Sequence, residues 1–263
     1  MTMNRDAWLA AHPYLRPVAE VDALVDAAAA AIRVPVAPLP DWDAYTVDFH
    51  AGVPLLESAE AAVDLSPSEG AVLPLIRKLV VSPLPSPLAE QCRVLEGELE
   101  GTVHTGELFS PSHPGLLRYL AWAVLARYLG PLVTGFDAWR NEDRWLRNYC
   151  PTCGERPAMA QLVGKDPGRL RKLSCGRCRT RWRYRRTGCP FCDRQDEHRL
   201  AVVAVEGESG LRIDYCETCG GYLKTYDGEG MESVLLADWT SLHLDLIARD
   251  RGLKRLATSL YEL

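Results

Sequence analysis

Four Cys-x-x-Cys pairs lie within seventy consecutive positions of the chain, and no other feature constrains its fold as strongly. The pairs are Cys150/Cys153, Cys175/Cys178, Cys189/Cys192 and Cys216/Cys219. The first and third read CPTC and CPFC, and 21 and 23 residues separate them from the second and fourth. This region is therefore one module that occurs twice. Sets of four thiolates bind zinc or iron tetrahedrally, so the sequence predicts two metal centres.

The sequence leaves open which pairs share a metal ion. The duplicated module and the hairpin-length insert inside each couple favour consecutive pairing, the first pair with the second and the third with the fourth. A crossed arrangement, first with fourth and second with third, is the alternative. Two facing pairs leave no open coordination position, which favours a structural metal in a domain too small to fold alone. Dithiol redox chemistry and electron transfer through iron are the other interpretations.

The residue that follows each pair differs between the four turns. Gly154 and Gly220 suit the left-handed backbone conformation that such turns often need. Arg179 and Asp193 take the corresponding places in the other two turns. We expect those two turns to be slightly more strained or differently shaped.

The bulk composition, with 47% hydrophobic and 25% charged residues, is that of an ordinary globular protein. No segment approaches the apolar length needed to span a bilayer, so no membrane insertion is expected, and the N-terminus lacks a secretory signal. The cytoplasm is therefore the expected compartment, where clustered cysteines bind metal rather than form disulfides. The unpaired Cys92 is interpreted as a small buried apolar residue in a helix.

Charge is distributed unevenly, with −8 over residues 1–149, +8 over 150–199 and −5 over 200–263. Within the basic part, the segment CRTRWRYRR alternates as a strand does. One face carries Arg177, Arg179, Arg181, Arg183 and Arg185, and the other carries Thr180, Trp182 and Tyr184. These arginines could offset the thiolate charge or dock the protein's own acidic helical body. An acidic partner protein and nucleic acid are the alternatives.

The predicted fold is α+β, with an N-terminal helical domain, two tandem rubredoxin-like or zinc-ribbon modules and a C-terminal helix. The predicted boundaries are 1–148, 149–187, 188–232 and 233–263. Six strands are expected in the ribbon modules, at AMAQLV, RLRKLSC, TRWRYR, LAVVAVEG, LRIDYC and YLKTYD. Helices are expected at about 18–32, 41–63, 67–81, 87–99 and 115–129, and from 131 or 136 to 147. The tail helix, about 238–256, would place one apolar face on the ribbons or the bundle; that face is Trp239, Leu242, Leu246, Leu253 and Leu256.

Catalytic groupings are sparse. His104 and His113 lie near Glu107 in a polar loop, where histidines are usually just solvated. The other histidines are isolated along the chain: His12, His50, His198 and His243. The nucleophile elbow, the phosphate-binding loop and the dinucleotide fingerprint are all missing from the sequence. No enzyme is predicted.

Residues 149–252 resemble the bacterial formate dehydrogenase accessory protein family, FdhE. The segments that carry the resemblance are CPTCGERPAMAQL, LSCGRCRTRWRYRRTGCPFC, YCETCGGYLKTYD and DWTSLHLDLIARDRG. The resemblance implies a cytoplasmic assembly factor for respiratory formate dehydrogenase that binds its catalytic subunit before export through the twin-arginine route. It also implies two rubredoxin-like sites, formed by the eight paired cysteines, that hold iron or zinc. The rival functions are a zinc-ribbon protein that binds nucleic acid, against which the overall acidity argues, and a rubredoxin-like electron carrier.

Overall fold

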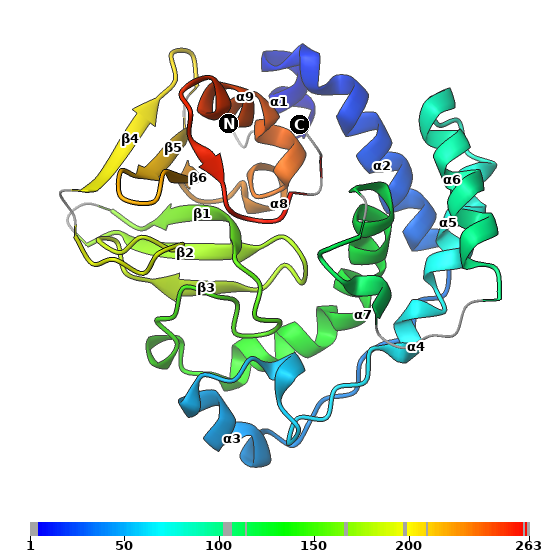
Figure 1. The fold of residues 1–263 in the computed structure, drawn as a ribbon, viewed down its shortest axis with the longest axis horizontal. Coiled ribbons are helices and arrows are strands. Elements are labelled where there is room, and N and C mark those ends of the chain that lie inside the picture. Colours follow the sequence, from blue (N-terminus) through cyan, green and yellow to red (C-terminus); the bar gives the residue numbers. More distant parts are fainter. Residues whose placement is uncertain are drawn as a thin grey trace.

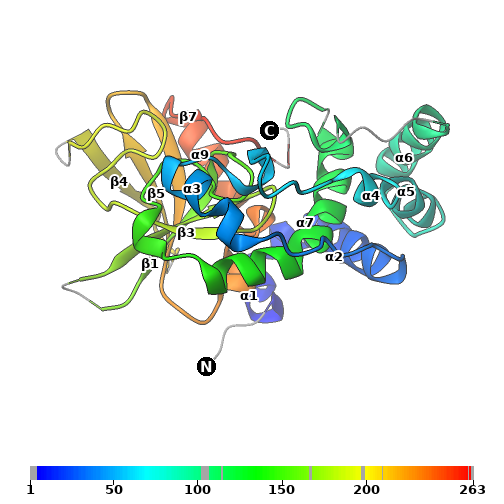
Figure 2. The ribbon, with the colours of Figure 1, turned by 90° about the horizontal axis from the view of Figure 1, so that it is seen from below.

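The computed structural model describes residues 5–101, 107–113, 115–165, 168–196, 199–208, 210–259 and 261. The N-terminal half forms a helical body, and the cysteine-rich half forms a sheet that lies beside it (Figure 1). Seen from below, helix α7 lies between this sheet and the outer helices α5 and α6 (Figure 2). This arrangement confirms the predicted α+β class.

The described helices follow the proline-punctuated pattern of the sequence. The helices of the body are α1 (Arg5–Ala11), α2 (Arg16–Ala31), α3 (Trp42–Ala51), α4 (Ser66–Glu69), α5 (Val72–Val80), α6 (Ser86–Leu99) and α7 (Gly115–Trp139), with short 3-10 turns η1 (Pro13–Leu15), η2 (Leu55–Glu57), η3 (Glu107–Phe109) and η4 (Glu142–Arg144). Helix α3 begins where the Asp41 side chain accepts the amide hydrogens of Asp43 and Ala44, and it ends at the left-handed Gly52. The predicted helix over 41–63 therefore stops at residue 51.

Helix α7 continues through Pro131, where the sequence had indicated a break and a second helix. A proline inside a helix costs about 3 kcal/mol. Leu129, Leu132 and Phe136 on either side of it are all fully buried, and this burial outweighs the cost. Contrary to the sequence-based expectation, α7 is long and apolar enough to cross a membrane by length and composition alone. Its apolar residues instead form the centre of the hydrophobic core.

The six predicted strands all form, and they join one continuous sheet rather than two separate ribbons. They are β1 (Pro157–Val163), β2 (Leu170–Cys175), β3 (Arg181–Tyr184), β4 (Leu200–Ala204), β5 (Leu211–Cys216) and β6 (Gly221–Asp227). Their order is β3-β2-β1-β6-β5-β4. Neighbours within each module are antiparallel, whereas β1 and β6 join the two modules in parallel.

This topology places both cysteine clusters at the same end of their modules. Strand β1 runs parallel to β6, and β6 is separated from β4 by two antiparallel pairings, so β1 and β4 run in the same direction. Each of these strands follows the first cysteine pair of its module, and the next strand leads into the second pair. The two modules are thus repeated side by side in one orientation.

The C-terminal segment is broken, although one helix over 238–256 was expected. It forms α8 (Glu232–Leu235), η6 (Asp238–Ser241), α9 (Leu242–Asp250) and β7 (Lys254–Arg255), which pairs with β6. The left-handed Gly252 ends the helix. Because the chain turns before α9, Leu244 and Ala248 face the core, whereas Leu246 is 42% exposed. The predicted apolar face was therefore wrong at Leu246. The segment packs on both the second module and α1–α2, in a core shared with Trp8 and Ile213.

Candidate metal centres

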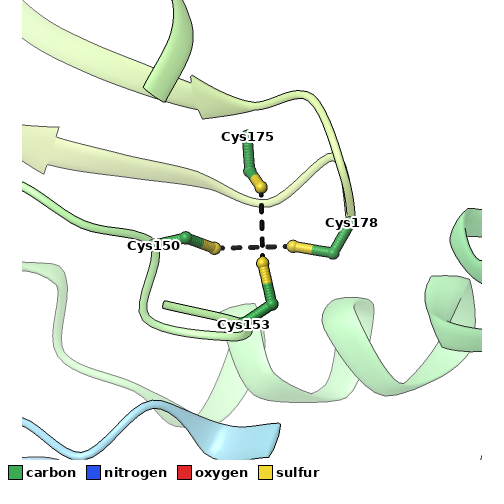
Figure 3. A group of neighbouring side chains, drawn as sticks. All are labelled: Cys150, Cys153, Cys175 and Cys178. Atoms are coloured by element: carbon green, nitrogen blue, oxygen red, sulfur yellow. Dashed lines mark hydrogen bonds between the residues drawn. The ribbon is translucent and has the colours of Figure 1, made fainter. Parts of the chain in front are cut away.

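The first cysteine cluster brings four sulfur atoms together from two turns of the first module. The Sγ atoms of Cys150 and Cys178 lie 3.4 Å apart, and those of Cys153 and Cys175 lie 3.5 Å apart. Figure 3 shows the four side chains pointing at one common centre. All four residues are buried. Consecutive pairing is therefore the arrangement that the structure has in this module.

The second cluster has the same composition but a more open position. The Sγ atoms of Cys189 and Cys219 lie 3.7 Å apart, and those of Cys192 and Cys216 lie 3.9 Å apart. Cys192 is exposed and Cys219 is partly exposed, unlike any cysteine of the first cluster. The second centre is therefore the one that solvent and chelators reach more easily.

All four cysteine turns have the same backbone. In each, the amide of the residue after the second cysteine donates to the carbonyl of the first cysteine; the donors are Gly154, Arg179, Asp193 and Gly220, at 2.8–3.1 Å. These four residues are also all left-handed, with φ of 73°, 63°, 54° and 70°. The expectation of a different shape at Arg179 and Asp193 was wrong, because closing the turn around two sulfurs requires this conformation whatever the residue. The expected strain remains, since a side chain in this region costs about 1–2 kcal/mol.

The helical body holds the first centre directly. The amides of Leu55 and Leu56 in η2 donate to the carbonyls of Pro151 and Thr152, at 2.9 and 2.8 Å. The hydroxyl of Thr152 lies 2.7 Å from that of Thr180, beside the second turn of the same centre. The first centre is thus part of the contact between the sheet and the helical body.

The geometry fits a tetrahedral metal ion. With metal–sulfur bonds of about 2.3 Å, a regular tetrahedron has sulfur–sulfur edges of about 3.8 Å. All four sulfurs of each cluster lie within 4.8 Å of one another. Burial raises the pKa of the Cys153 and Cys175 thiols well above the ordinary value, and a divalent cation would offset the cost of ionising them there. Both clusters can therefore hold a metal ion.

The middle of the arginine row contacts the protein itself. Arg183 pairs with Asp143 of η4, and Arg181 donates to Gln161 of β1. Arg179 shares a cleft with Asp22 of α2. Both Arg179 and Arg185 are exposed. The ion pair of Arg183 favours docking of the acidic helical body over nucleic-acid binding for the middle of the row.

The remaining histidines divide into two groups. His113 is partly exposed in a loop and lies 2.9 Å from the carbonyl oxygen of Glu107, while His104 and His198 lie outside the described residues. His12 and His243 meet at Glu208 to form a third cluster. The sequence analysis missed this cluster because no spacing pattern connects its members. As predicted, Cys92 is buried in a helix, α6.

A helical body that carries two closed four-cysteine ribbons in one sheet defines the protein as a tandem zinc-ribbon protein. No family model matches the chain. It is 33% identical over 133 residues to the FdhE homologue of Aquifex aeolicus, covering 49% of this chain and 47% of that protein. It is 28% identical over 193 residues to the FdhE homologue of Shewanella baltica, covering 72% of this chain and 60% of that protein.

The chain thus spans about half to three fifths of the length of these curated relatives. The likeness to a solved structure extends further along the chain. The crystal structure of the FdhE protein from Pseudomonas aeruginosa superposes with a TM-score of 0.62 and 25% identity, covering 94% of this chain and 88% of that one. The chain is therefore similar to FdhE proteins both in sequence and in fold.

Proposed function

We propose that this protein is a cytoplasmic accessory factor in the assembly of respiratory formate dehydrogenase, and that it binds the catalytic subunit of that enzyme. The observation that carries the proposal is the similarity to FdhE proteins, which extends over the helical body as well as the cysteine modules. Charge supports a protein partner, because an acidic helical body accompanies exposed basic residues such as Arg185. Binding through such charges would weaken as salt rises.

A role in holding a client fits the cysteine sites better than catalysis does. Four thiolates fill a tetrahedral coordination sphere, so neither centre offers a substrate an open position. The metals would instead fix the sheet on which the helical body rests. We therefore propose that the protein is not an enzyme.

We also propose that the eight paired cysteines hold two metal ions per chain, iron in the native host and zinc after overproduction. The support is the all-thiolate donor set, which accepts either metal. Protein purified anaerobically from the native host should show thiolate-to-iron charge-transfer absorption and about two metals per chain. Colourless protein that contains only zinc would contradict the iron assignment and leave the structural one intact.

The function is tested in cells that lack the chromosomal copy of the gene. The wild-type chain should restore formate dehydrogenase activity, and an affinity-tagged chain should retain the catalytic subunit during purification. The Cys150→Ser/Cys153→Ser variant should do neither, whereas Cys92→Ala, which changes a cysteine outside both centres, should do both. Full activity in the deletion strain would contradict the proposal, as would specific nucleic-acid binding at physiological salt without retention of the subunit.

A further inference from the structure

His12, Glu208 and His243 form a third group of metal-binding side chains, separate from the cysteines. His12 lies between α1 and η1, Glu208 in the turn between β4 and β5, and His243 in the first turn of α9. The Nε2 atoms of His12 and His243 lie 2.8 and 2.7 Å from Oε1 of Glu208. The three side chains are 10%, 6% and 14% exposed, so the carboxylate is almost entirely withdrawn from water.

The carboxylate of Glu208 lacks the partners that its burial demands. Its Oε2 atom is buried and has no hydrogen-bond partner among the described residues. A buried carboxylate with one unpaired oxygen is costly unless a cation compensates it. The described groups that approach this carboxylate as possible cations are the two imidazoles.

The orientation of His12 presents a lone pair to this carboxylate. Its Nδ1 lies 3.0 Å from the carbonyl oxygen of Trp8, which can only accept, so Nδ1 carries the proton. In the neutral ring, Nε2 then has a lone pair, and a lone pair 2.8 Å from a carboxylate oxygen requires a proton or a metal ion between the two atoms. The ring is held by stacking on Trp8, with centroids 3.9 Å apart. A ring whose other nitrogen is fixed by a backbone carbonyl is typical of metal-binding histidines.

His243 completes the arrangement from the opposite side. Its Nε2 is close to Glu208, but the contact is too bent for a hydrogen bond, and its Nδ1 also has no partner among the described residues. The lone pair of His243 Nε2 therefore does not point straight at Oε1 of Glu208. This geometry suits a metal ion bound by both the imidazole and the carboxylate.

We propose that His12, Glu208 and His243 bind a third metal ion, a first-row divalent cation such as zinc. Two imidazoles and one carboxylate are an established donor set for such ions. All three ligand atoms lie within 4.8 Å of one another, close enough to share one ion. The ion would tie the N-terminal helix to the second module and to α9, three segments that lie far apart in the sequence.

The test uses tag-free, full-length protein whose cysteine sites are first filled with Zn²⁺, and the probe is Co²⁺. Wild-type protein should bind one further equivalent of Co²⁺ without thiolate-to-cobalt charge-transfer absorption, which would report exchange into the cysteine sites. Glu208→Gln and His243→Ala should weaken this binding by about tenfold or more, since each removes a ligand. His50→Ala, which changes an exposed histidine on α3, should bind as the wild type does.

Retention of two Zn²⁺ and of the circular dichroism spectrum shows that each variant has folded. If a variant fails to fold, NMR of the wild-type protein tests the proposal instead. Bound Co²⁺ should shift the signals of His12 and His243 but not that of His50. The proposal is overturned if wild-type protein binds no additional Co²⁺. The two histidines and Glu208 would then be linked by protons alone and not by a metal ion. It is equally overturned if both folded variants bind Co²⁺ as tightly as the wild type, or if only other histidine signals shift.

Discussion

Ala160 of strand β1 and Thr225 of strand β6 are paired in register across the parallel junction between the two cysteine modules. Ala160 belongs to the first module and Thr225 to the second, and both are fully buried. The two modules therefore share one hydrogen-bonded sheet. The division at residues 187 and 188 remains a prediction, and because of this junction unfolding of the second module should expose β1 of the first.

Replacing Cys189 and Cys192 together by serine should remove one metal equivalent per chain. The second module should lose its structure, since its folding depends on the ion. Because β6 borders β1, protection of β1 amides from hydrogen exchange should also fall, while the α5–α7 core stays protected. Metal analysis and hydrogen exchange measure both effects. Cys92→Ala is the matched control and should keep both metals; two tightly bound metals in the serine variant would rule out these ligands.

A chelator should empty the two centres in order. The second centre should release its metal first, because Cys192 is exposed whereas all four cysteines of the first centre are buried. Release followed with a metal indicator dye should therefore show two phases of equal amplitude. The Cys189→Ser/Cys192→Ser variant should retain only the slow phase. A single phase from wild-type protein, or loss of the slow phase in this variant, would show that burial does not govern release.

Gly220→Ala should destabilise the protein by about 1 kcal/mol through backbone conformation alone. Gly220 has φ of 70°, and an added Cβ would contact only the flexible end of Lys254 at 3.9 Å. The matched control is Gly97→Ala within α6, where nothing lies within 4 Å of the added carbon. There the same substitution should stabilise by about 0.5–1 kcal/mol. Free energies of unfolding of the same sign for both variants would contradict this interpretation.

Asp238 is held in a buried ionic network with Lys224 and Arg255, at 2.6 and 2.8 Å. Burial alone would raise the pKa of Asp238, but the two cations outweigh it and hold that pKa well below its usual range. Asp238→Asn should therefore cost about 3–5 kcal/mol near neutral pH, since it leaves buried positive charge less compensated.

The sign of the pH dependence follows from the lowered pKa of Asp238. Its contribution is complete above the unfolded pKa of about 3.9 and is lost as pH falls towards the lower folded value. The free-energy difference between wild type and Asp238→Asn should therefore shrink below about pH 4. Glu217→Gln, which breaks an exposed pair with Arg199, is the control and should cost at most about 1 kcal/mol. Equal losses in the two variants would contradict the prediction.

The sequence predicted the local structure well and the long-range structure poorly. Cysteine spacing and strand alternation are local signals, so the four turns and six strands could be located from them. The β1–β6 junction has no such signal, because nothing in the alternation of AMAQLV indicates which strand it pairs with. Likewise, Glu208 is 196 positions from His12, and only the fold brings them together. At Pro131 a correct local rule failed, since the buried residues around it outweighed the local preference.

Arg183 and Arg185 separate docking within the protein from binding of a partner. Both belong to the predicted arginine row, but Arg183 pairs with Asp143 of the helical body whereas Arg185 is exposed. Arg183→Glu should place like charges together and loosen the contact between β3 and η4, which hydrogen exchange of β3 would detect. Arg185→Glu should leave the fold and both metals unchanged.

If the exposed end of the row contacts the catalytic subunit of formate dehydrogenase, Arg185→Glu should weaken binding at low salt. The difference from wild type should fade as screening shortens to about 10 Å or less above roughly 0.1 M salt. Surface plasmon resonance at several salt concentrations measures this, and formate dehydrogenase activity in complemented cells should fall in parallel. Unchanged binding by folded Arg185→Glu at every salt concentration would show that the row serves only the protein's own assembly. The accessory function would then depend on a surface of the helical body.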